Sequence, residues 1–222
     1  MGKNTILVFC AHSDDQVFGP GGTLAKYAKE GKTIYTVIFS YGEGSHPHFK
    51  KDIIVKTRMK EAIKADKIIG GKSVEFFGLP DNKKFKSEFD NRNLHEKLKE
   101  MVVEYAPAKI FTHSDTDTHH HHRLVNEMVL RAVDDLKQKI PVYTFDVWNF
   151  FGVRRYNTPK LVIDISDTFK TKMSALRVFK SQLKPLNYMI GNNFLYLQVY
   201  INDFIEGLIY RKRFAEVFYK VR

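Results

Sequence analysis

The sequence predicts an α/β fold: a single domain, residues 1–222, in which helices flank both faces of an open, mostly parallel β-sheet. Continuous apolar runs rich in β-branched residues, such as Thr5 to Ala11, are typical of strands buried on both faces. These runs alternate with segments of helical periodicity, which is the order of elements in α/β proteins. A chain of 222 residues with 43% hydrophobic residues is long enough to bury one sizeable core.

The first forty residues predict a strand–loop–helix–strand unit. We expect strands at Thr5–Ala11 and Thr33–Ser40, and between them a helix from Thr23 that ends at Gly31. Two parallel strands joined in this way close with a right-handed crossover. The segment Gly19–Gly22 has neither the G-x-G-x-x-G spacing nor the lysine of a phosphate-binding loop, so we interpret it as a tight turn.

The middle of the chain continues the alternation. Helical periodicity from Ile54 to Ala65 precedes a short strand at Val74–Phe77, and a polar, turn-like segment follows at Lys83–Asn93. Apolar residues on one face predict a helix at Leu94–Tyr105, and a fourth strand is expected at Lys109–Thr112.

The remainder predicts three helices and two strands. A polar loop from His113 to His122 precedes a helix at Arg123–Leu136. Further strands are expected at Pro141–Trp148 and Leu161–Ile165, with further helices at Thr168–Gln182 and Phe204–Val221.

The chain is basic, with a formal net charge of +11 and a pI near 9.5. Such a charge fits either an anionic partner or a lysine-rich solvated surface. The lysines are spread along the chain and no nucleic-acid-binding motif accompanies them, which favours the solvated surface over a specific nucleic-acid partner. A positive field of this kind also steers an anionic small-molecule substrate toward the protein.

The N-terminal region contains no membrane or export signal. The apolar stretch from Ile6 to Ala11 is too short for a transmembrane span or a secretory segment, so we expect a cytoplasmic protein. The one cysteine, Cys10, excludes an internal disulfide and is expected to be a buried small hydrophobic residue.

A first group of chemically active residues follows the first strand. His12, Asp14 and Asp15 stand together at its end, where three neighbouring polar groups are costly to bury without partners. A metal ion held by His12 and Asp15, with Asp14 left free, resolves this cost. The alternative is that one of the aspartates caps the helix that follows.

A second group lies in the loop after the fourth strand. Five histidines and two aspartates fall within the ten residues from His113 to His122. His122 leads directly into a predicted helix, which would fix its position, and His119 lies one turn earlier. The alternative is a surface histidine cluster without a function.

Together the two groups predict a metal centre, because the carboxyl ends of parallel strands meet at one edge of such a sheet. Catalytic zinc has three protein ligands and an open position for water, whose pKa the ion lowers to about 7. Asp14 is placed to act as a general base, and a protonated His119 to stabilise an oxyanion. The same donors suit Fe²⁺ or another divalent metal.

These motifs resemble those of the PIG-L/LmbE-like deacetylases. Ala11–Gln16 is similar to their A-H-P-D-D-E signature, and His119–Arg123 to their H-P-D-H-R segment. Arg58–Glu61 resembles an R-x-x-E motif, Leu79–Asp81 an L-P-D motif, and Ala215–Glu216 a weaker C-terminal mark. The resemblance therefore covers nearly the whole chain.

The resemblance implies a Rossmann-like fold and a zinc-dependent hydrolase that removes an N-acetyl group from a GlcNAc-containing glycoconjugate or related amide by metal-hydroxide attack. By position, His12, Asp15 and His122 would bind the metal. Asp14 would be the general base, His119 would stabilise the oxyanion, and Arg58 would contact the sugar. The alternative for Arg58 is an ion pair with Glu61 on the same helix.

Three positions depart from the family pattern. Ser13 replaces a proline, Gln16 replaces a glutamate, and His121 replaces the aspartate expected to support His119. We hypothesise that Asp115 or Asp117 takes over that support. The alternative function is a catalytically altered, metal-containing sugar-binding member of the family.

Three loops are expected to form the rim that selects the substrate. They are the segments Tyr41–Lys51, Asn82–Asn91 and Trp148–Asn157, each of which follows a predicted strand.

Overall fold

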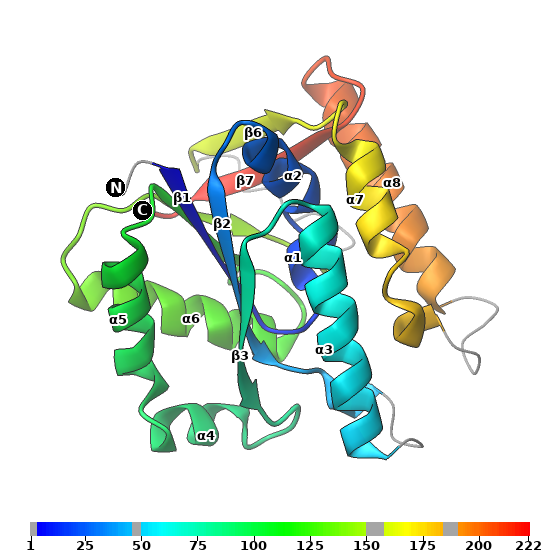
Figure 1. Cartoon of the computed structure of the whole chain (residues 1–222). Helices are drawn as coiled ribbons and strands as arrows, with labels where there is room; N and C mark the ends of the chain where they lie inside the picture. The colour runs from blue at the N-terminus through cyan, green and yellow to red at the C-terminus, as the bar shows by residue number, and fades with distance from the viewer. Residues whose placement is uncertain (1–3, 46–49, 150–157, 184–190) are drawn as a thin grey trace.

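The strands form one seven-stranded sheet (Figure 1). The computed structural model describes residues 4–45, 50–149, 158–183 and 191–222. In these ranges the strands are β1 (Thr5–Cys10), β2 (Thr33–Ser40), β3 (Ser73–Leu79), β4 (Lys109–His113), β5 (Val142–Phe145), β6 (Lys160–Asp164) and β7 (Ala215–Lys220). Their order is β3-β2-β1-β4-β5-β7-β6, with β7 antiparallel to both neighbours and the other pairs parallel. The predicted mostly parallel α/β sheet is confirmed.

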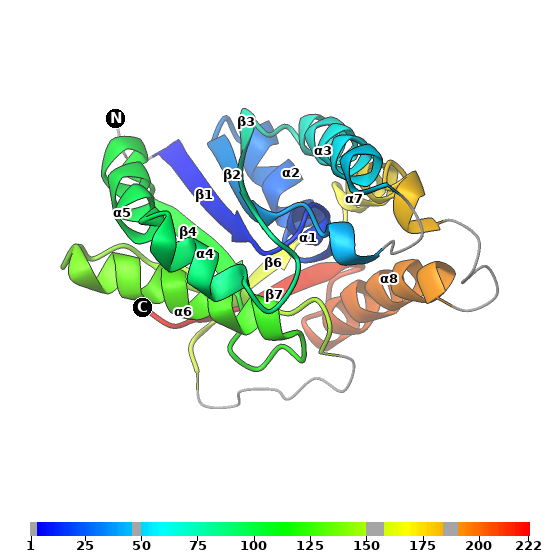
Figure 2. The same cartoon turned by 90° about the horizontal axis from the view of Figure 1, so that it is seen from below.

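Helices cover both faces of this sheet, as predicted (Figure 2). One face packs against α4, α5 and α6, and the other against α1, α2, α3, α7 and α8. The helices are α1 (Asp15–Phe18), α2 (Gly21–Lys29), α3 (Lys51–Ile68), α4 (Phe85–Asn91), α5 (Leu94–Tyr105), α6 (His120–Asp135), α7 (Phe169–Leu176) and α8 (Gly191–Ile209), with short 3-10 turns at Glu43–Ser45 and Lys180–Leu183.

The apolar run of β1 serves two cores at once. Leu7 and Phe9 pack into the core under α4–α6, while Ile6, Val8 and Cys10 pack into the core on the opposite face. All five are at most 2% exposed. Because successive strand residues point to opposite faces, a strand covered on both sides is apolar without alternation. Cys10 is buried and free, as expected.

The segment Lys83–Asn93 is not the turn that its polar sequence predicts, because it contains the helix α4. Phe85 and Phe89 are one helical turn apart, only 1% and 3% exposed, and anchor α4 to the core. Charged residues around these two phenylalanines conceal the periodicity in the sequence. The packing of two aromatic side chains outweighs the weak helical propensity of their neighbours.

The C-terminal segment also differs from the prediction. Phe204–Val221 is not one helix: α8 ends at Ile209, and Ala215–Lys220 forms the strand β7. β7 lies between β5 and β6 and pairs with both, so two neighbouring strands satisfy its backbone groups. The predicted helix Thr168–Gln182 ends at Leu176.

A buried ionic network fixes the glycine-rich turn near the end of β1. Nζ of Lys172 donates to Glu216 at 2.7 Å, to Asp203 at 2.9 Å and to the carbonyl of Gly19 at 3.1 Å. The Glu216 carboxylate in turn accepts backbone N–H groups from Gly22 and the residue after it. A Cβ on Gly22 would lie 2.7 Å from Ile165, so the close approach requires glycine. Gly21 and Gly22 begin α2, so the turn predicted at Gly19–Gly22 covers only its first two residues.

Within the described ranges, no helix is both long enough and apolar enough to cross a membrane.

Candidate metal centre

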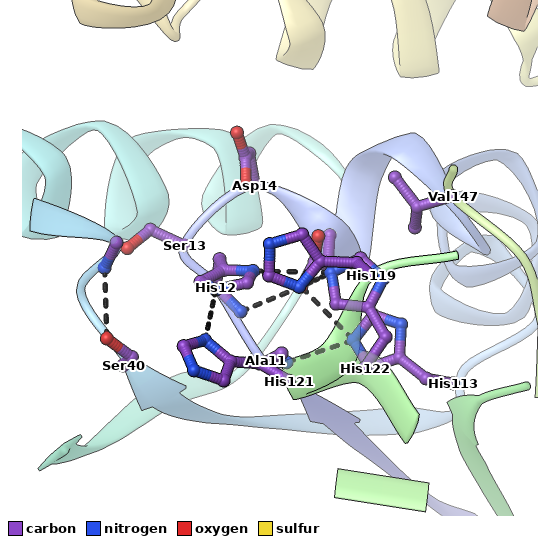
Figure 3. Close-up of polar contacts among 12 residues, drawn as sticks. Ala11, His12, Ser13, Asp14, Ser40, His113, His119, His121, His122 and Val147 are labelled. Carbon is purple, nitrogen blue, oxygen red and sulfur yellow. Dashed lines mark hydrogen bonds and ion pairs between the residues drawn. The ribbon is translucent and has the colours of Figure 1, made fainter. Parts of the chain in front are cut away.

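Two adjacent parallel strands bring the chemically active loops together. β1 pairs with β4, with Val8 opposite Phe111, so their carboxyl ends lie side by side. His12 follows β1 and His113 ends β4. α6 begins at His120, three residues earlier than predicted, so His122 is held in its first turn. Figure 3 shows the resulting cluster of histidine rings.

Three of the predicted ligands lie at the spacing of atoms that share one ion. His12 Nδ1 is 3.2 Å from His122 Nε2, and Asp15 Oδ2 is 3.6 Å and 3.5 Å from these two atoms. A tetrahedral ion with bonds of about 2.1 Å separates its ligand atoms by about 3.4 Å. His12, Asp15 and His122 are all buried and form one of the groups able to hold a metal ion.

Each of these two imidazoles faces a carboxylate with its other nitrogen. Asp81 Oδ1 lies 3.4 Å from His12 Nε2, and Asp117 Oδ2 lies 3.1 Å from His122 Nδ1. Carboxylates in this position fix the tautomer and orientation of metal-binding histidines. Once His12 gives up its extra proton, the nitrogens of the two rings that face Asp15 offer lone pairs to an ion.

A third histidine, His113, lies against the Asp15 carboxylate. His113 is fully buried and stacks on the His122 ring at a centroid separation of 3.9 Å. Its Nε2 accepts the backbone N–H of Ala11 at 2.9 Å and lies 3.1 Å from Asp15 Oδ2. Asp15 Oδ2 also accepts the backbone N–H of His12 at 2.7 Å. The carboxylate is therefore held in one orientation by the loop that carries it.

Asp14 stands apart from the histidine rings and points away from them (Figure 3). Its Oδ1 lies 3.4 Å from Nη2 of Arg58, whose side chain is 4% exposed. Burial raises the pKa of the Asp14 carboxyl above its usual value, although Arg58 opposes the shift. Arg58 thus pairs with Asp14, whereas Glu61, its alternative partner, accepts hydrogen bonds from the backbone and hydroxyl of Ser181.

His119 lies beside the three candidate ligands, with its ring 4.8 Å from that of His12. Burial, together with the charge of His12, lowers the pKa of His119 to about 4, which favours the neutral imidazole at neutral pH. Asp117 does not support this ring as we hypothesised. It accepts the His119 backbone N–H at 2.9 Å, and its carboxylate faces the ring of His122 instead.

All three departures from the family pattern, Ser13, Gln16 and His121, are buried. The Gln16 side chain is fully buried, and neither its oxygen nor its nitrogen has a hydrogen-bond partner among the described residues. His121 stacks on Phe85 at a centroid separation of 4.3 Å and points Nδ1 at Asp81, 3.1 Å away. His121 therefore faces the same carboxylate as His12.

The charges of the site fit a divalent cation. Burial disfavours a charged His12, but Asp15 and Asp81 outweigh it and raise the pKa of His12 to about 10. Burial lowers the pKa of His122 to about 3, which leaves its imidazole neutral. A proton on His12 is thus the positive charge that faces the carboxylates of Asp15 and Asp81. Mixed imidazole and carboxylate donors of this kind suit zinc and other first-row metals.

A cavity of about 340 Å³ is lined in part by Pro80, the residue before Asp81, but by none of the candidate ligands and by neither Asp14 nor His119. It is lined by Tyr41, Glu43 and Lys51 from one predicted rim loop and by Lys84 and Glu88 from another. Two of the three predicted rim loops therefore contribute residues to the lining of this cavity. Residues 46–49 of the first loop and 150–157 of the third lie outside the described residues.

Sequence reasoning missed the positions of Asp81 and His113. Asp81 was visible only as part of an L-P-D motif, and its contact with His12 depends on the packing of β3 against β2. His113 had a usable signal, because it is a polar residue at the carboxyl end of a buried strand.

The fold and the donor set define a class: α/β proteins with a candidate metal centre at the carboxyl edge of a parallel sheet. Residues 7–133, more than half of the chain, match the GlcNAc-PI de-N-acetylase family, PIG-L. The chain belongs to this family, as the sequence motifs indicated.

Individual relatives fall into two activity classes. A probable N-acetyl-α-D-glucosaminyl L-malate deacetylase 2 of Bacillus cereus is 24% identical over 82% of this chain and 84% of its own length. The N,N′-diacetylchitobiose deacetylase of Pyrococcus horikoshii has a TM-score of 0.78 at 19% identity, covering 98% of this chain and 84% of that one. The 4-carboxy-2-hydroxymuconate hydratase of Pseudomonas putida has a TM-score of 0.82 at 22% identity, covering 100% and 97%. These two solved structures share the fold.

Proposed function

We propose that this chain is a zinc-dependent N-deacetylase that removes an acetyl group from a GlcNAc-containing glycoconjugate or a related amide. The observation that carries the proposal is the triangle of His12 Nδ1, Asp15 Oδ2 and His122 Nε2, with sides of 3.2 to 3.6 Å, in a member of the de-N-acetylase family. When bound there, zinc supplies a Lewis acid that polarises the acetyl carbonyl and makes water acidic.

Asp14 carries both proton transfers in this proposal. Asp14 accepts a proton from the attacking water, and its raised pKa lets it hold that proton. The water oxygen bonds to the acetyl carbon, the C–N bond breaks, and Asp14 returns the proton to the leaving amine. The products are acetate and a free amine.

His119 and Arg58 position the reacting groups in this proposal. His119 is a neutral imidazole at neutral pH, so it donates a hydrogen bond to the developing oxyanion from a ring N–H and carries no charge of its own. Arg58 holds the Asp14 carboxylate from α3, and we assign to it a contact with the sugar of the bound substrate. Asp81 and Asp117 keep the two metal-binding imidazoles in the required orientation.

The cavity beside Asp81 is the proposed site of the rest of the substrate. Three cationic side chains line it, Lys51, Lys84 and Arg92, against two carboxylates. This balance and the net charge of +11 favour an anionic conjugate over a neutral sugar.

The test is acetate release from a panel of N-acetylglucosamine conjugates, measured with and without a chelator. We expect release that requires metal, and a fall in kcat of about 10²- to 10⁴-fold in Asp14→Asn, the range for loss of a general base. Zinc content should be unchanged in that variant, because Asp14 points away from the cluster. No metal-dependent release from any N-acyl substrate contradicts the proposal.

The same panel separates two other functions. Zinc and sugar binding without turnover would indicate a catalytically altered sugar-binding protein. The motivating observation is the buried Gln16 amide, which has no hydrogen-bond partner in the part of the chain that the structure describes. An arm with an unsaturated dicarboxylate tests hydration, the activity named for the relative from Pseudomonas putida.

A further inference from the structure

A second triangle of donor atoms lies on the far side of His12. His12 Nε2 is 3.4 Å from Asp81 Oδ1 and 3.4 Å from His121 Nδ1, and the last two atoms are 3.1 Å apart. These separations match those of the first triangle and the value of about 3.4 Å for ligands of one tetrahedral ion. The two triangles share the His12 ring, each through a different nitrogen.

The second triangle exists because of a departure from the family pattern. His121 stands where the PIG-L/LmbE-like motif has an aspartate, so this chain adds an imidazole where relatives that follow the motif have none. The ring is not a loose surface group. It is 9% exposed and stacks on Phe85, which is itself 1% exposed. A donor held in this way binds an ion with little loss of side-chain entropy.

The carboxylate of the second triangle is also fixed in place. Asp81 Oδ2 accepts the backbone N–H of Gly44 at 3.1 Å, which turns Oδ1 toward His12 and His121. His119 lies nearby, and donor atoms of His12, His119 and His121 all fall within 4.8 Å of one another. His119 is therefore close enough to provide a fourth ligand.

We propose that His12 Nε2, Asp81 Oδ1 and His121 Nδ1 form a second divalent-cation site that binds a zinc-class ion after the first site is filled. This inference rests on the proposed function, since both sites use His12. Binding there replaces the proton on His12 Nε2, so the ring bridges two ions as imidazolate and one proton is released to solvent. Two nitrogens and one oxygen select Zn²⁺, Cu²⁺ or Ni²⁺ over Mg²⁺ or Ca²⁺.

The second ion would change the centre in two ways. It neutralises the Asp81 carboxylate, which otherwise orients His12. It also takes His119 as a further ligand, and His119 is then no longer free to bind the substrate. We therefore expect excess zinc to lower activity in the wild type.

The test counts bound zinc in the metal-stripped full-length protein, by titration against a chromophoric chelator. We expect two equivalents in the wild type and one in His121→Gln. The matched control is His120→Gln, the same change in the neighbouring residue of the same helix, whose side chain is exposed; it should keep two equivalents. Asp81→Asn, with folding checked by circular dichroism, should also bind one.

Three results would overturn the inference: one equivalent in the wild type, two in His121→Gln, or loss of the second ion in His120→Gln as well. Co²⁺ absorption gives an independent readout, because the second equivalent should add d–d bands that His121→Gln lacks. Acetate release measured at one equivalent separates the two proposals. If one bound ion supports release and no second ion binds, only the second site is wrong; if zinc binds without release, the proposed function fails.

Discussion

Replacing Asp117 with asparagine should weaken metal binding without touching a ligand. The Asp117 carboxylate accepts backbone N–H groups from His119 at 2.9 Å, Val147 at 2.8 Å and Trp148 at 3.1 Å, and faces His122 Nδ1 at 3.1 Å. Each oxygen of Asp117 has at least one donor in front of it. Whichever way the asparagine amide turns, its NH₂ group faces a donor and leaves that donor without a partner.

The magnitude follows from these contacts. One buried N–H without a partner costs about 1–3 kcal/mol of unfolding free energy. Loss of the carboxylate behind His122 should raise the zinc dissociation constant about 10- to 100-fold, the usual effect of removing such a group. The first effect is measured by urea unfolding of metal-free protein, and the second by competition with a chelator of known affinity.

The matched control is Asp115→Asn, the same substitution two residues away at an exposed position. Its zinc affinity should stay within about twofold of the wild type, since Asp115 belongs to no group of described side chains that are spaced to hold a metal ion. Equal zinc affinity in Asp117→Asn and Asp115→Asn would refute the orienting role of Asp117.

Three further predictions concern the scaffold. Burial raises the pKa of Asp66 to about 7, so the folded state holds this proton more tightly than the unfolded state does. The unfolding free energy of the wild type should therefore fall by about 3 kcal/mol between pH 5 and pH 8, and Asp66→Asn should lack that fall. Parallel curves of stability against pH for the two proteins would contradict the assignment. Lys172→Met leaves the carboxylates of Asp203 and Glu216 without their cation and should cost about 3–5 kcal/mol in urea unfolding; a change below about 1 kcal/mol would show that the network is not needed. Phe89→Ala should cost about 3–5 kcal/mol and lower helicity in α4, and no loss would mean that α4 is not anchored by this ring.

The parallel half of the sheet could be predicted because its strands are apolar on both faces. The strand Thr33–Ser40 and the helix Leu94–Tyr105 were both predicted with the bounds that the structure shows. Local sequence determines such elements when every side chain faces a core or a regular apolar stripe repeats. The helix α4 was missed because it is anchored by two phenylalanines among charged residues, which pack against distant parts of the chain. The strand β7 was missed because it depends on pairing with β5 and β6, which lie far from it in the sequence.

The candidate site could be predicted only in part, for a similar reason. The rule that parallel strands end at one edge was enough to bring His12 and His122 together. It could not assign Asp81 and Asp117 to particular histidines, because those pairings depend on side-chain directions within loops. Nor could it give the protonation of His119, which follows from burial and from the charge of His12.

The central claim is that His12, Asp15 and His122 hold one zinc ion. Anomalous diffraction from crystals of the metal-stripped protein soaked with one equivalent of zinc tests it most directly. We expect a single strong peak about 2.0–2.2 Å from His12 Nδ1, Asp15 Oδ2 and His122 Nε2. A peak elsewhere in the histidine cluster, or none among these three side chains, would contradict it.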